Sequence, residues 1–134
     1  EVDGSRENMS GDSAVGDSDL PIFDREGLIN RMMHEEELVR VVIEGFLEDI
    51  PKQIAVLKGF VESGNTSMVA LRAHTIKGAS ANVGGERLRA VAGEMERLAE
   101  GENPTSMKKQ MQEMENEFNV LKQAMEEVKG GFSS

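Results

Sequence analysis

The 134-residue chain has no cysteine and only two histidines, and these shortages exclude several kinds of protein. Without cysteine there is neither a disulfide framework nor a thiolate metal site. The two histidines, His34 and His74, stand 40 positions apart and form no local pair of imidazole ligands. We therefore expect no bound metal, no cofactor and no metal-dependent enzyme.

Long apolar runs and nucleotide motifs are also missing. No stretch approaches the roughly 18 consecutive apolar residues of a membrane span, and the first thirty residues lack the basic start and apolar run of a signal peptide. No Walker-type glycine-rich loop or kinase nucleotide motif is present. The net charge of -10 disfavours nucleic-acid binding, because phosphate backbones select basic surfaces. We expect a cytoplasmic protein without direct membrane contact and without its own ATP site.

The negative charge is unevenly distributed. Residues 1–19 hold six acids and one base and so supply -5, half of the total. We predict a disordered acidic leader or linker over residues 1–20. Residues 72–89 instead carry +3. A locally positive surface would suit an anionic partner or a phosphoryl group, although such charges can also be a scatter of solvated side chains.

Apolar residues at helical spacing predict a short helix and four long ones. The short helix starts near Asp24 and carries Leu28, Ile29, Met32 and Met33. The first long helix begins after His34, and the other three cover about 66–83, 86–100 and 104–129. Their predicted buried stripes are Val39, Val42, Phe46, Ile50, Ile54, Leu57 and Val61; then Val69, Ala73, Ile76, Ser80 and Val83; then Leu88, Val91, Met95 and Leu98; and finally Met107, Met111, Met114, Phe118, Leu121, Met125 and Val128.

Short connections separate these helices. Gly64 and Asn65, then Gly84 and Gly85, and then residues 101–104 supply helix stops and caps. Connections this short force neighbouring helices to run antiparallel. The fold class we predict is all-α, an antiparallel up-down-up-down four-helix bundle over residues 21–129 with a short additional N-terminal helix. Residues 130–134 would be a flexible tail, and we expect a monomer.

One face of the third predicted helix carries the chemistry. A helical wheel puts His74 about 140° from the core stripe, so its imidazole points outward. Neutral imidazole is a nucleophile near neutral pH, and Lys77, one turn away, can neutralise phosphoryl oxygens. Glycine inside a helix costs roughly 1 kcal/mol against alanine, so Gly78 implies clearance for a partner. The residues around His74 that would contact this partner are Ser67, Ala70, Leu71 and Ala81.

The spacing of these residues distinguishes a site from ordinary surface. Lys at +3, Gly at +4, Gly at +10 and Leu at +14 from one His has odds on the order of one in ten thousand by chance. At these residues, in the run from Ala73 to Gly84, the chain resembles the histidine-containing phosphotransfer (HPt) family with its H-x-x-K-G signature. The resemblance covers about residues 24–128 and includes Phe46 to Asp49 and Leu88 to Glu96.

The resemblance implies a phosphocarrier in a two-component phosphorelay. His74 would accept a phosphoryl group, through Nε2, from the Asp of a response-regulator receiver domain and pass it to another receiver. Lys77 would hold phosphoryl oxygens, and Gly78 would let the receiver approach. By the same resemblance any Mg²⁺ belongs to the receiver. The chain would act alone or within a hybrid sensor histidine kinase, as its cytosolic domain where that kinase is membrane-bound.

Two alternatives and one departure from the family remain. The chain could be the phosphorylatable first domain of a chemotaxis-type histidine kinase, or a non-catalytic helical scaffold that needs no reactive His. Many family members also have a Gln or a similar polar group that hydrogen-bonds the imidazole. No Gln lies in residues 66–83, and Ser67 is the substitute that the sequence offers.

Overall fold

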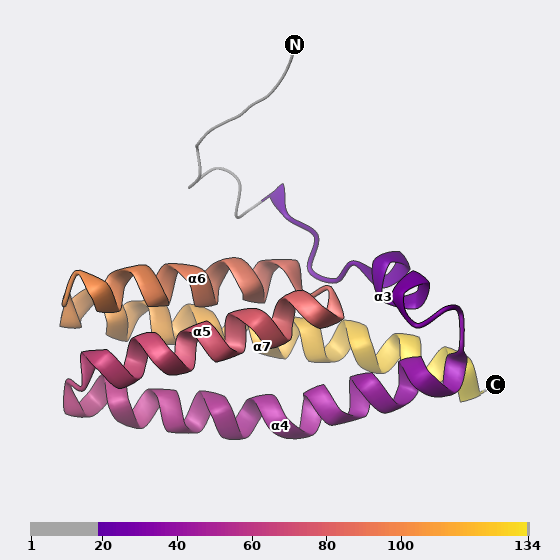
Figure 1. Ribbon diagram of the computed structural model, residues 1–134, viewed down its shortest axis with the longest axis horizontal. Helices are drawn as coiled ribbons and strands as arrows, with labels where there is room; N and C mark the ends of the chain where they lie inside the picture. Colours follow the sequence, from indigo (N-terminus) through magenta and orange to yellow (C-terminus); the bar gives the residue numbers. More distant parts are fainter. Residues whose placement is uncertain (1–18, 134) are drawn as a thin grey trace, which may run out of the picture.

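A computed structural model describes residues 19–133, with side chains through Gly131. This part is helical and contains no strand. Its elements are α3 (Arg25–Arg31), α4 (Glu36–Ser63), α5 (Thr66–Val83), α6 (Glu86–Glu100) and α7 (Pro104–Ser133). The four long helices lie side by side and alternate in direction (Figure 1), with α4 and α6 each packed against both α5 and α7. The predicted all-α, up-down-up-down four-helix bundle with a short preceding helix is confirmed.

The connections end and start helices as their residue types require. Gly64 and Gly84 are the C-caps of α4 and α5, and both have a left-handed φ, of 76° and 81°. Glycine adopts this conformation without the steric cost of a Cβ. Asn65 caps α5 by accepting a hydrogen bond from the Met68 amide at 3.3 Å, and Asn103 accepts one from Ser106 at 3.1 Å.

The core contains the complete predicted stripes of α5 and α7. In α4, however, Ile43 is buried and Val42 only partly so; in α6, Ala92 and Ala99 are buried and Leu98 is partly buried. Both corrections have one cause. A helical wheel gives the direction of a side chain but not which edge of the apolar stripe the neighbouring helices cover. Residues at that edge can therefore be buried where their neighbours were predicted to be.

Both ends of the bundle differ from the prediction. α3 ends at Arg31, so Met33 is not part of it; Met33 has φ 56° and is 79% exposed. At the other end α7 continues to Ser133, where the sequence placed the end of the bundle at 129 and a tail beyond it. Residues 1–18 of the predicted leader lie outside the described residues.

The segment before α4 is hydrogen-bonded to the C-terminal end of α5 and to the start of α6. The Asp24 amide donates to the Gly84 carbonyl at 2.7 Å, Arg87 Nε donates to the Leu20 carbonyl at 2.7 Å, and Arg31 Nη2 donates to the Asn82 carbonyl at 3.0 Å. Two of these acceptors are carbonyls at the C-terminal end of α5, which a helix leaves without partners of its own. The contacts hold that end of α5 in place.

Among the described helices, none combines the length and the apolar character needed to cross a membrane.

Candidate functional site

His74 lies in the middle of α5 with 64% of its side chain exposed. Its neighbours Ala73 and Ile76 are fully buried. Successive helical residues are about 100° apart. Because Ala73 and Ile76 face the core, His74 points out of the bundle, as the wheel predicted. The imidazole is therefore accessible to a molecule the size of another protein.

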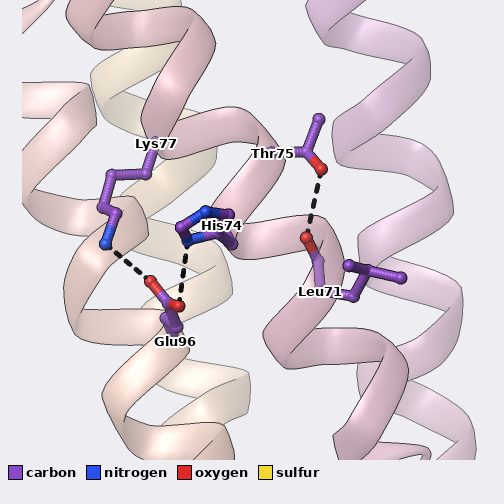
Figure 2. A network of polar contacts seen from close by, with 5 residues as sticks. All are labelled: Leu71, His74, Thr75, Lys77 and Glu96. Carbon is purple, nitrogen blue, oxygen red and sulfur yellow. Dashed lines mark hydrogen bonds and ion pairs between the residues drawn. The ribbon is translucent and has the colours of Figure 1, made fainter.

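A carboxylate on the adjacent helix holds the imidazole (Figure 2). Glu96 Oε2 lies 3.1 Å from His74 Nδ1, and Glu96 Oε1 lies 2.8 Å from Lys77 Nζ. Met95 is buried in the core stripe of α6, so Glu96, the next residue, lies on the flank that faces α5. One carboxylate thus contacts both polar side chains of the H-x-x-K-G motif, His74 and Lys77.

The protonation of Glu96 determines which nitrogen of His74 is free. The pKa of Glu96 is lowered from its ordinary value, first by the hydrogen bond from Lys77 and then by the charges of Lys77 and His74, although partial burial opposes this. An ionised carboxylate only accepts hydrogen bonds. In the neutral ring the proton must therefore be on Nδ1 and be donated to Glu96, which leaves the lone pair on Nε2.

Small and apolar residues surround the imidazole, as the sequence indicated. Gly78 is exposed, and a Cβ built on it would meet nothing within 4 Å. Ser67 and Ala81 are exposed, Leu71 is 55% exposed, and Ala70 is partly buried against the core. The surface beside His74 is open, and Gly78 has no packing role within the bundle.

The structure gives a partner to each of the four cations in the expected positive surface around His74, but the partners of Arg72 and Arg87 are uncharged and leave that positive charge in place. Lys77 is paired with Glu96 at 2.8 Å, Arg89 is paired with Glu86 at 3.0 Å, and Arg87 is bonded to the Leu20 carbonyl. Arg72 Nη1 donates to Gln53 Oε1 on α4 at 3.1 Å. With a neutral imidazole, the group of His74, Lys77 and Glu96 carries no net charge. Of these partners only Glu96 adds a negative charge that the count over residues 72–89 left out, because Glu86 lies within that segment.

Sequence reasoning missed Glu96 and pointed to Ser67 as the orienting group. A signal was nevertheless present. Two antiparallel helices joined by a tight turn bring residues at equal distances from the turn side by side. His74 and Glu96 each lie 11 positions from Gly85. Ser67 belongs to α5, the helix of His74 itself, whereas Glu96 belongs to α6.

Fold and site together define a class of protein: an up-down helical bundle that presents one oriented imidazole with a free Nε2 on an open surface. The family model of the Hpt domain matches residues 41–131, which is more than half of the chain. The chain therefore belongs to the Hpt domain family.

A solved structure shows the same fold. The crystal structure of histidine-containing phosphotransfer protein B (HptB) from Pseudomonas aeruginosa PAO1 matches with a TM-score of 0.77 and 22% sequence identity, covering 82% of this chain and 96% of that one. No curated protein sequence matches the chain.

Family membership supports a histidine phosphotransfer role in phosphorelays, in which the domain carries a phosphoryl group and has no ATP-binding catalytic site of its own. Domains of this kind act with response-regulator receiver domains. Within residues 19–133, no group of three or more His, Cys, Asp or Glu residues could hold a metal ion.

Proposed function

We propose that His74 is the residue that carries the phosphoryl group, accepting it from the Asp of one receiver domain and passing it to the Asp of another. The observation that carries the proposal is the contact of 3.1 Å between His74 Nδ1 and Glu96. It selects the tautomer whose free nitrogen is Nε2, on a ring that is 64% exposed.

The transfer needs no proton relay. The Nε2 lone pair attacks phosphorus, the bond from phosphorus to the donor Asp oxygen breaks, and its electron pair leaves with the Asp carboxylate. The ring then carries positive charge, with its proton still on Nδ1, and the Glu96 carboxylate stabilises that charge at hydrogen-bond distance. In the onward step the ring leaves as neutral imidazole, again without moving a proton. Glu96 therefore serves both directions.

Lys77 supplies the cation for the phosphoryl oxygens. In the resting site its Nζ is bound to Glu96 Oε1, and its side chain is 36% exposed. A phosphoryl group on Nε2 brings about two negative charges, and these compete with Glu96 for the ammonium. We propose that Lys77 turns toward the phosphoryl oxygens while Glu96 keeps its hydrogen bond to Nδ1–H.

The receiver would dock on the open surface around His74. Leu71 supplies an exposed apolar contact, and Gly78, Ser67 and Ala81 leave room for close approach. We propose that the domain acts as a cytoplasmic monomer, alone or within a hybrid sensor kinase, and holds no cofactor. Any Mg²⁺ needed by the transfer belongs to the receiver.

The test mixes the chain with a panel of purified receiver domains, each phosphorylated with acetyl phosphate and Mg²⁺. We expect at least one receiver to transfer acid-labile, alkali-stable phosphate to the chain, and His74→Gln to abolish that label. A chain that takes no such label from any receiver, or a label that persists in His74→Gln, would contradict the proposal. His34→Gln is the matched control and should be labelled normally.

A further inference from the structure

The side chain of Lys77 reaches Glu96 by crossing the surface of α6 (Figure 2). The residue beneath this crossing is Gly93, which is half-buried inside α6. A Cβ built on Gly93 would lie 3.4 Å from Cδ of Lys77, the only atom that it would meet within 4 Å outside its own helix. A Cβ would thus be in van der Waals contact with the aliphatic part of Lys77, and a side chain that extends beyond Cβ would compete with it for space.

The bundle geometry explains why these two residues meet. Lys77 and Gly93 each lie eight positions from Gly85, in the turn that joins α5 to α6, so they face each other as His74 and Glu96 do one turn further along. Glu96 follows Gly93 by three residues on the same face of α6. The lysine thus extends over Gly93 to reach the carboxylate.

Glycine in a helix interior is unfavourable relative to alanine, so position 93 carries a cost. Two glycines of α4 provide a comparison, because a Cβ at Gly45 or Gly59 would meet nothing within 4 Å. A substitution at those positions changes helix propensity alone. At Gly93 the same substitution also meets the side chain of Lys77.

We propose that Gly93 is a positioning residue: it keeps open the path over α6 along which Lys77 moves between Glu96 and phosphoryl oxygens on His74. Only the second end of that path, the phosphoryl oxygens on His74, rests on the proposed function. The first end, the pair of Lys77 with Glu96, is a property of the resting protein. A large side chain at position 93 would hold the ammonium away from α6 and from both anions.

The first measurement concerns the resting pair and needs no phosphoryl transfer. In Gly93→Leu, the pKa of Glu96, followed by carboxyl carbon NMR, should rise toward the value that it has in Lys77→Met, because the hydrogen bond from Lys77 is the first cause of its lowering. Gly45→Leu should leave it unchanged. Circular dichroism checks folding, and if Gly93→Leu does not fold, Gly93→Gln takes its place with the same expected result.

The second measurement is the rate at which phosphoramidate, a small donor that needs no docking surface, phosphorylates His74. Gly93→Leu should lower this rate roughly tenfold, as expected for the loss of one charge-assisted hydrogen bond. It should cause no further loss in a Lys77→Met background, because a residue that acts through Lys77 has nothing left to act on.

An unchanged pKa of Glu96 in the folded variant would overturn the positioning role, and so would losses in Gly93→Leu and Lys77→Met that multiply in the double variant. These results are distinct from failure of the proposed function. In that case the wild-type chain would take no phosphate on His74 from phosphoramidate or from any receiver, while the pKa of Glu96 would still report on Gly93.

Discussion

Lys77 and Glu96 form an ion pair between α5 and α6, with Nζ 2.8 Å from Oε1. The cation expected to hold phosphoryl oxygens is thus already bound to a carboxylate in the resting protein. If His74 carries the phosphoryl group as we propose, that group would meet a site without net charge, in which it must draw Lys77 from Glu96. The site therefore binds the phosphoryl group less tightly than a site with an unpaired lysine would. Weaker binding suits a carrier that must also release the group.

Removing the Glu96 carboxylate should slow phosphorylation of His74. A hydrogen bond to a charged group contributes about 1.5–3 kcal/mol, so Glu96→Ala should lower the rate of labelling by phosphoramidate by about 10- to 100-fold. Glu96→Gln retains an acceptor oxygen and should lose less. Glu94→Gln removes a carboxylate that pairs with Arg97 on the same helix and serves as the control. Wild-type labelling of Glu96→Ala would show that the carboxylate does not activate the ring.

Substitutions at Gly78 should affect the stability of the bundle and the docking of its partner in different ways. Gly78→Ala should raise the free energy of unfolding by about 0.5–1 kcal/mol, because its Cβ meets open space. Gly78→Leu should lower transfer from a phosphorylated receiver at least tenfold yet leave labelling by phosphoramidate unchanged. Gly130→Leu, at another open helical position in α7, should leave both rates unchanged. Equal loss with the two donors would mean that Gly78 does not provide clearance.

The two left-handed glycines should differ in their sensitivity to substitution. At Gly64 (φ 76°) a Cβ meets nothing, whereas at Gly84 (φ 81°) it would lie 2.7 Å from the backbone oxygen of Asp24. Gly64→Ala should cost about 1–2 kcal/mol for its backbone conformation. Gly84→Ala should cost more, because the N-terminal segment must also shift. Urea unfolding measures both, and equal losses would show that the contact with Asp24 yields freely.

Acid should weaken the bundle partly through Glu96. The folded-state pKa of this carboxyl lies below its ordinary value near 4.5, chiefly because Lys77 donates to it. Its stabilising contribution is therefore present above about pH 4.5 and is lost as the pH falls through the lowered pKa. In Lys77→Met this acid-dependent loss should be smaller, whereas Lys108→Met, which removes a cation elsewhere, should retain it. Unfolding free energies measured across the acid range compare the three proteins, and identical pH dependence would contradict the assignment.

Much of the fold could be predicted from the sequence because the signals are local. The stripe from Met107 to Val128 repeats at steps of four and three, and every one of its members is buried. Gly64 and Gly84 end helices, and Asn65 and Asn103 cap them, through contacts with residues only a few positions away. The outward direction of His74 follows from the same periodicity.

Other features depend on which helix lies beside which. Val42 and Ile43 are equally apolar neighbours, and only the packing of α4 among the other helices decides that Ile43 is the buried one. Along the chain Lys77 and Arg72 have no evident partner, and the structure supplies Glu96 from α6 and Gln53 from α4. Residues that are distant in sequence supply such contacts, and periodicity carries no information about them.

The sequence by itself determined that the chain forms an antiparallel bundle with an exposed imidazole, because helical period and helix caps act over a few residues. Only the tertiary structure decided that Glu96 holds this imidazole and Lys77 together, and that Gly93 lies under the lysine. Those contacts form when α5 and α6 fold back on each other at Gly85, which brings residues 11 and 8 positions from the turn within the few ångströms over which hydrogen bonds and side-chain contacts act.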